Sequence, residues 1–202
     1  MSSTTTFPQQ TLIGAVWPEG SLARPLRLAI LALAGTALLT LSAKIQIPFY
    51  PVPMTMQTFA VLAIGLAFGW RLGGATLLLY LAEGAAGLPV FAGTPEKGVG
   101  IAYLMGPTGG YLLGFALAAA LSGWLAERGW DRSAATTALA MLAGNVAIYV
   151  PGLLWLGGLI GWDKPVLELG LIPFLAGDLF KLVLAAAVMP LAWKAVRRWR
   201  DG

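Results

Sequence analysis

Long stretches without a charged residue limit what this sequence can fold into more than any other feature. Residues 98–126 and 133–162 contain no Asp, Glu, Lys or Arg. Each stretch exceeds the roughly 20 apolar residues that a helix needs to cross the hydrocarbon core of a bilayer. Charged residues make up only 11% of the 202-residue chain, against about 25% in soluble domains. The sequence therefore predicts an all-α integral membrane protein.

Turns and charged residues divide the chain into six predicted membrane-spanning helices. Pro48, Pro51 and Pro53 lack amide hydrogens and end the first helix, so an extended, ordered loop is expected there. The basic, glycine-rich turn at residues 69–74 separates the second helix from the third. The expected helices cover residues 28–43, 56–70, the segment from that turn to about residue 88, about 108–126, 133–162 and 172–193.

The distribution of basic residues predicts the orientation in the membrane. With six spans, nine basic residues fall on the side of the termini and three on the other, and an excess of Lys and Arg marks the cytoplasmic side. We therefore expect both termini in the cytoplasm. Residues 1–22 are predicted to be a disordered cytoplasmic tail, and residues 23–202 a single transmembrane domain. The nine are Arg24, Arg27, Arg71, Arg128, Arg132, Lys194, Arg197, Arg198 and Arg200; the three are Lys44, Lys97 and Lys164.

The residue types that are missing exclude several kinds of chemistry. The chain has no cysteine and no histidine, which removes disulfides, thiolate or imidazole catalysis and the usual ligands of zinc and iron. No serine is paired with a recognisable base and no aspartate dyad is apparent, so neither an enzyme nor a bound metal or cofactor is expected. No G-x-x-x-x-G-K-[ST] loop is present, so any ATP is hydrolysed by a partner. The net charge of +4 is spread singly along the chain, which argues against nucleic acid.

Asp178 and Lys181 are charged residues inside the last predicted span. Each costs about 2.5–3.5 kcal/mol near the centre of a membrane helix. Because they are three residues apart, their side chains share one helix face. Two interpretations stay open: a self-contained ion pair, or a polar pocket in which the carboxylate accepts N–H groups and the ammonium donates. We favour the pocket, because apolar residues would serve at least as well as an isolated pair.

Further polar and aromatic residues are predicted to face the same cavity, toward the outer side of the membrane. Asn145 also suits hydrogen bonding between helices, and aromatic residues at a membrane interface often contact lipid headgroups instead of a ligand. A pocket with one acid, one base and aromatic walls suits a small amphipathic molecule. The additional candidates for substrate binding are Gln57, Tyr50, Phe91, Lys97, Tyr111 and Asn145.

Small residues predict where helices approach each other closely. The glycines at 106, 110 and 114 recur every four residues, a spacing that favours close helix packing in lipid. Ala32, Thr36 and Thr40 form a comparable stripe on the first helix. We interpret that stripe as a candidate docking face for a partner protein.

Several blocks of sequence together resemble the BioY family, the biotin-specific substrate-binding (S) components of energy-coupling factor (ECF) transporters. The resemblance covers about residues 25–195, and its specificity comes from the order and spacing of the blocks. They are AKIQIP at 43–48, PVPMTMQT at 51–58, AGLPVFAG at 86–93, GPTGGYLLGF at 106–115, GN at 144–145 and PFLAGDLFK at 173–181.

This resemblance implies a six-helix S-component fold in a bacterial cytoplasmic (inner) membrane, which binds biotin with high affinity from outside the cell. It also implies docking on a transmembrane coupling (T) protein with two ATP-binding cassette (ABC) ATPases. Biotin contacts are implied for Asp178 and Lys181, and for Lys97 in the loop before the GPTGGY block. Biotin carries two ureido N–H donors, a ureido carbonyl and a carboxylate, and the acid, the bases and Asn145 are suited to these groups.

Other functions stay open on the sequence. One is an S component for a different small vitamin. Another is a membrane assembly subunit without transport, in which Asp178 and Lys181 pair only with each other. The sequence also leaves open whether the chain forms a homo-oligomer and which polar residue meets which end of the vitamin.

Overall fold

The computed structural model describes residues 11–17 and 23–201, and the regular structure in these ranges is almost entirely helical. The long helices are α2 (Arg24–Lys44), α3 (Gln57–Ala85), α5 (Gly109–Ala126), α6 (Ala134–Ile160) and α8 (Ile172–Asp201). The short elements are α1 (Leu12–Val16), β1 (Gln46–Ile47), β2 (Met54–Thr55), α4 (Ile101–Leu104) and α7 (Val166–Gly170). Five helical segments in these ranges are long and apolar enough to cross a membrane. The prediction of an all-α membrane protein is confirmed.

Helix α3 joins the predicted second and third helices and breaks sharply at Gly69. Gly69 has φ 81° and ψ 173°, a backbone conformation that is essentially restricted to glycine. The chain folds back on itself there, since a Cβ added to Gly73 would lie 3.1 Å from the Cα of Gly65. Helix α3 therefore has two arms, residues 57–68 and 70–85, and the predicted turn falls at the break between them.

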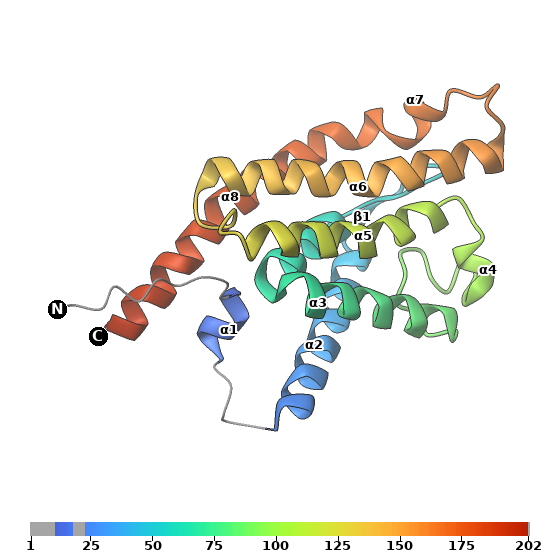
Figure 1. Cartoon of the computed structure of the whole chain (residues 1–202). Helices are drawn as coiled ribbons and strands as arrows, with labels where there is room; N and C mark the ends of the chain where they lie inside the picture. Colours follow the sequence, from blue (N-terminus) through green and yellow to red (C-terminus); the bar gives the residue numbers. More distant parts are fainter. Residues whose placement is uncertain (1–10, 18–22, 202) are drawn as a thin grey trace.

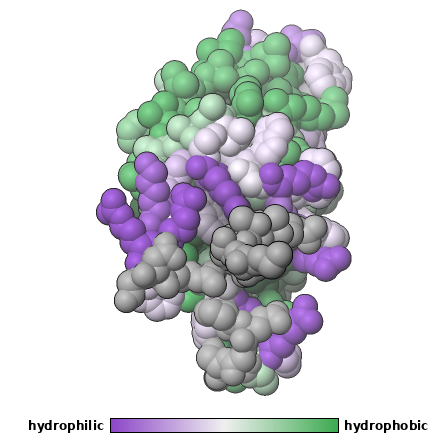
Figure 2. Space-filling model, turned by 60° about the vertical axis from the view of Figure 1, so that its left-hand side comes forward, coloured by the Kyte–Doolittle hydropathy of each residue, from purple (hydrophilic) through white to green (hydrophobic). Residues whose placement is uncertain are grey.

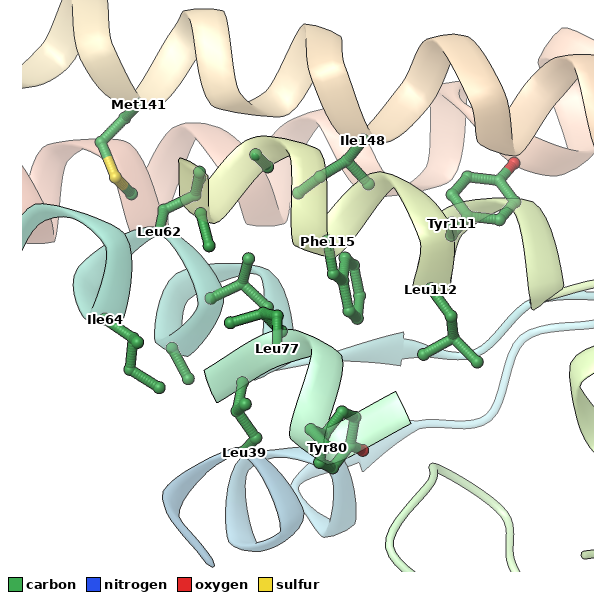
Figure 3. Close-up of a cluster of buried hydrophobic side chains, with 14 of the residues drawn as sticks. Leu39, Leu62, Ile64, Leu77, Tyr80, Tyr111, Leu112, Phe115, Met141 and Ile148 are labelled. Carbon is green, nitrogen blue, oxygen red and sulfur yellow. The ribbon is translucent and has the colours of Figure 1, made fainter. Parts of the chain in front are cut away.

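Helix α5 lies in the centre of the bundle, between α3 and α6 (Figure 1). The apolar side chains of these helices meet in the core, where Leu62 and Leu77 of α3 lie near Phe115 of α5 (Figure 3). The α5–α6 contact is very close, because a Cβ added to Gly114 would lie 2.8 Å from the carbonyl oxygen of Ile148. The close packing predicted from the glycine spacing is confirmed. Helix α8 is the most exposed long helix, and it packs mainly on α6.

The proline-containing loop between α2 and α3 is ordered, as predicted. Strands β1 and β2 pair antiparallel, with Gln46 opposite Thr55 and Ile47 opposite Met54. This pairing was not predicted. It places β2 just before the start of α3, alongside α5 and α6 (Figure 1).

The segment predicted to be a disordered tail contains the short helix α1. The side chain of Thr11 caps this helix by accepting a hydrogen bond from the Gly14 N–H at 3.2 Å. Ala15 is buried, and α1 packs on α3 and α8. The prediction of disorder is therefore wrong for residues 12–16, because tertiary contacts stabilise a helix too short to be stable alone. Residues 1–10 and 18–22 of the predicted tail lie outside the described ranges.

Candidate ligand-binding site

A cavity lies where the start of α3 meets α5, α6, α8 and the loops on either side of α3. Its volume is about 50 Å³, which is room for only a few water molecules. A ligand of vitamin size therefore requires the walls to move apart. The cavity is lined by Val52, Pro53, Thr55, Gln57, Thr58, Ala92, Tyr103, Thr108, Tyr111, Leu112, Phe115, Ile148, Tyr149, Phe174 and Lys181.

One wall of the cavity carries a buried polar network from three helices. The Lys181 ammonium on α8 donates to Asp178 Oδ1 at 3.0 Å and to Thr58 Oγ1 of α3 at 2.7 Å. Thr58 Oγ1 in turn donates to Asp178 Oδ1 at 3.3 Å, and the Tyr149 hydroxyl on α6 donates to Asp178 Oδ2. Both charged residues are 5% exposed. The network satisfies the buried charges and ties α8 to α3 and α6.

The other hydroxyl groups around the cavity hold the loops in place. Gln57 Nε2 donates to the Tyr80 hydroxyl at 2.6 Å, and that hydroxyl donates to the Val90 carbonyl at 2.8 Å. The Tyr103 hydroxyl donates to the Ala92 carbonyl. Because the two tyrosine hydroxyls donate to backbone carbonyls, they fix the loop after α3 against the bundle on the side of the cavity.

Lys44, at the end of α2, holds the same loop from the outside. Its ammonium donates to the carbonyl oxygens of Phe91 at 3.0 Å and Thr94 at 2.9 Å, and to Thr94 Oγ1 at 3.2 Å. Ala92, which lies between these acceptors, lines the cavity. These three hydrogen bonds add to those from Tyr80 and Tyr103 in holding this cavity wall.

The structure brings four of the predicted substrate-binding residues to the cavity or directly behind it. Gln57, Tyr111 and Lys181 line the cavity. Asp178 lies behind Lys181 and lines an apolar groove on the other side, between α6 and α8. The self-contained ion pair and the polar pocket thus coexist, since the two charges contact each other and one of them also faces the cavity.

The remaining predicted residues lie away from the cavity. Asn145 lines the α6–α8 groove together with Asp178. Phe91 is fully buried and stacks on Tyr103, and it is not among the lining residues. Lys97 is exposed, and Tyr50 is 89% exposed.

The stripe predicted as a docking face turns partly inward. Thr36 is 4% exposed and its hydroxyl donates to Glu83 of α3 at 3.1 Å. Thr40 donates to the backbone of its own helix, and Ala32 and Thr40 are half-buried. Within this chain, the middle of the stripe therefore packs on α3.

Sequence reasoning missed Tyr149 as a site residue. Tyr149 contacts Asp178 and lines the cavity, but in the sequence it is one aromatic residue in an uncharged run. The only signal was its position four residues after Asn145, on the same face of the helix. Tyr80 was also missed, because its contacts include a loop residue, Val90, that the sequence does not show to be its neighbour.

Several apolar helices around a cavity with an acid, a base and hydroxyl groups in one wall define the class of this protein. It is a multi-pass helical membrane protein with a candidate ligand-binding cavity between its helices.

Comparison with known proteins identifies the family. Residues 14–198 match the BioY family. A probable biotin transporter BioY of Pyrococcus horikoshii is 38% identical over 152 residues, 75% of this chain and 87% of that protein. The biotin transporter BioY of Thermotoga maritima is 40% identical over 153 residues, 76% of this chain and 88% of that protein. The chain belongs to the BioY family.

A solved structure shares the fold. The crystal structure of the S-component for biotin from an ECF-type ABC transporter superposes with a TM-score of 0.67 at 23% identity, and the match covers 90% of this chain and 96% of that one. This likeness confirms the predicted S-component fold.

Proposed function

We propose that this chain is the biotin-binding S component of an ECF transporter and takes part in biotin uptake across a bacterial cytoplasmic membrane. The observation that supports this most is the buried network of Asp178, Lys181, Thr58 and Tyr149 in the wall of a cavity. Membership of a family whose curated relatives are named biotin transporters points to the same ligand.

The chemistry of the cavity suits the ureido ring and the apolar parts of biotin. Lys181, which faces the cavity, is suited to donate to the ureido carbonyl, and Asp178 is suited to accept a ureido N–H once Thr58 or Tyr149 moves aside. Phe115, Phe174 and Ile148 offer apolar contacts to the ring and the tail. Buried partners of this kind discriminate strongly, because an analogue without the donors leaves a buried polar group unpaired.

The carboxylate end requires a cation near the mouth of the cavity. Lys97 lies on the loop that contains Ala92, and an added Cβ on Gly93 would meet the aliphatic part of its side chain at 2.9 Å. We propose that Lys97 approaches the valerate carboxylate when this loop moves. Tyr50, Phe91, Asn145 and Tyr111 remain candidates for contacts in that rearranged site.

Transport requires partners in this proposal. A T component and two ABC ATPases supply the energy, ATP is hydrolysed by those ATPases, and the chain itself catalyses no reaction. The stripe of Ala32, Thr36 and Thr40 on α2 is the proposed docking face for the T component. Six crossings with both termini on one side follow if each arm of α3 counts as one crossing, which the break at Gly69 supports. The excess of basic residues on that side favours the cytoplasm.

Titration calorimetry of the purified chain tests the ligand. We expect tight binding of biotin and of desthiobiotin, which keeps the ureido ring, and much weaker binding of an analogue in which that ring is opened. A Lys181→Met variant should lose binding of both ureido ligands. Equal binding of all three compounds would remove the support for a ureido-specific site. Binding of another vitamin but not biotin would favour the S component of different specificity, and no binding at all would favour an assembly subunit.

A further inference from the structure

A second, polar cleft lies where the break in α3 meets the end of α5, far from the candidate ligand-binding site. It is lined by Trp70, Arg71, Trp124, Glu127 and Arg128. Nothing in the proposed transport function uses these residues. The cleft brings together two arginines and two half-exposed tryptophans, with exposed fractions of 41% for Trp70 and 43% for Trp124.

Each arginine of the cleft is placed over its neighbouring tryptophan. The Arg128 guanidinium carbon lies 3.4 Å from the centre of the Trp124 ring, and that of Arg71 lies 5.0 Å from the centre of the Trp70 ring. These contacts fix the two guanidinium groups without using their N–H donors. Each guanidinium has five such donors, and the described contacts use one of them, from Arg128 to the Trp124 carbonyl at 3.0 Å.

No carboxylate among the described residues neutralises the two arginines by an ion pair; the pairs found in those ranges are Lys164–Asp163 and Lys181–Asp178. Glu127 lies in the cleft, but its Oε1 accepts the backbone N–H of Trp70 at 3.2 Å. Its role in the structure is to hold the turn after Gly69. The cleft therefore keeps a net positive charge with free donors.

The cleft lies at the strongly hydrophilic end of the molecule. Gly69 is next to Thr11 at the start of α1, and Asp131, three residues after Arg128, bonds to Trp193 near the end of α8. Figure 2 views this end, where hydrophilic side chains gather below a broad hydrophobic surface. The boundary between such surfaces is where lipid headgroups meet a membrane protein, and exposed tryptophans are typical of that level.

We propose that this cleft binds the phosphate group of an anionic phospholipid. Arginine matches phosphate geometry with two parallel N–H donors, and two arginines in one cleft offer such a fork from each side. The tryptophan rings lie against the glycerol and the first methylene groups of the same lipid. The ligand is a lipid rather than a free phosphate ester, because the aromatic surface contributes only when an acyl chain continues into the bilayer.

Native mass spectrometry of the full chain in detergent tests the proposal. The probes are dihexanoyl phosphatidylglycerol, dihexanoyl phosphatidylcholine and glycerol 3-phosphate. We expect the phosphatidylglycerol to be retained most and the soluble ester not to compete with it. Arg71→Gln with Arg128→Gln should weaken phosphatidylglycerol binding by about tenfold or more, about 1.4 kcal/mol or more.

Two matched variants separate a specific site from general attraction to positive charge. Arg197→Gln with Arg198→Gln removes the same charge from exposed positions on α8 at this end and should leave binding nearly unchanged. Glu127→Gln keeps an oxygen for the Trp70 N–H but removes the negative charge, so it should tighten binding. Equal losses in the two double variants, or equal retention of the neutral lipid or of the soluble ester, would overturn the proposal.

Discussion

The Asp178 carboxylate is surrounded by donors from three helices. Lys181, Thr58 and Tyr149 all donate to it, so its acceptor positions are largely used within the chain. A ligand that binds to Asp178 must replace one of these donors. Tyr149 and Thr58 are neutral, and their displacement costs less than separation of the ion pair. In the proposed biotin site, recognition therefore depends on how readily the Thr58 or Tyr149 hydroxyl is exchanged for a ureido N–H.

Replacing Asp178 by Asn tests its role directly. Asp178→Asn keeps the size but removes the charge that holds Lys181, so we expect biotin binding to weaken by more than about tenfold, about 1.4 kcal/mol. Titration calorimetry of the purified variant measures this. The matched control is Asp163→Asn, which breaks an exposed pair with Lys164 and should leave the affinity unchanged. Unchanged affinity in Asp178→Asn would refute the assigned role.

Asp131 lies in the loop after α5 and is 1% exposed. Its Oδ2 accepts the Trp193 indole N–H, while its buried Oδ1 has no partner among the described residues. Burial raises the pKa of Asp131 above its ordinary value of 3.8, and the bond from Trp193 only partly opposes this. Ionisation is therefore easier in the unfolded chain than in the folded one. The folded state loses stability as the pH rises from about 3.8 through the raised pKa.

Asp131→Asn removes this cost and keeps an oxygen for Trp193. We expect the variant to unfold at a higher temperature than the parent at pH 7, and this gain to shrink as the pH falls toward 4, because protonation of the parent carboxyl removes the cost of burying its charge. Thermal unfolding followed by tryptophan fluorescence at both pH values measures the difference. A gain of the same size at both values, or none at pH 7, would contradict the assigned cause.

Single residues differ in how visible they are in the sequence. The importance of Asp178 and Lys181 was predictable, because charged residues inside a membrane helix are costly unless they have polar partners. Tyr149 was not, because one tyrosine among apolar residues fits lipid, core or site equally well. Phe91 was assigned to the cavity from its loop, but the direction of its side chain depends on packing against Tyr80 and Tyr103, which spacing along the chain does not reveal.

At the scale of elements, the break in α3 depends on one residue. Gly69→Ala places a side chain at φ 81°, and the new Cβ would lie 2.7 Å from Thr11 Cγ2. We expect a loss of about 1–3 kcal/mol in the free energy of unfolding, seen as a lower unfolding temperature in detergent. Gly74→Ala is the control, since its Cβ would meet only Ala120 Cβ at 3.7 Å. Similar unfolding temperatures for the two variants would argue against a strained turn.

The loop held by Lys44 is an element whose movement should control access to the cavity. Lys44→Met removes three hydrogen bonds to residues 91 and 94. Hydrogen bonds from a charged group contribute about 1.5–3 kcal/mol each, so even partial loss should speed biotin release by about tenfold or more. Release of radiolabelled biotin after dilution measures this rate. Lys164→Met serves as the control, and release at the parent rate from Lys44→Met would show that this loop is not the gate.

The long elements were predictable and the short ones were not. The expected spans at 108–126 and 133–162 agree closely with α5 and α6, because apolar length and flanking charges define a crossing. The β1–β2 pairing and α1 depend on partners across the fold. The five-residue helix α1 is too short to be stable alone, and the Thr11 cap and the contacts with α3 and α8 stabilise it.

For the whole molecule, the count of basic residues predicts orientation, and the lack of cysteine makes that easy to test. In intact cells, a thiol at exposed Glu96 should react with a membrane-impermeant maleimide, whereas a thiol at exposed Arg198 should react only after permeabilisation. Glu96→Cys and Arg198→Cys provide the two sites, and the cysteine-free parent is the background control. The reverse labelling pattern would invert the proposed topology.

The walls of the ligand cavity come from residues 52 through 181. A partly synthesised chain lacks some of these walls. A newly made protein can therefore bind its ligand in the cavity only after α8 has packed on the other helices. A ligand that binds in this cavity therefore stabilises only the completely folded chain. In a growing cell, the supply of the vitamin would consequently affect how much of the newly made protein escapes degradation.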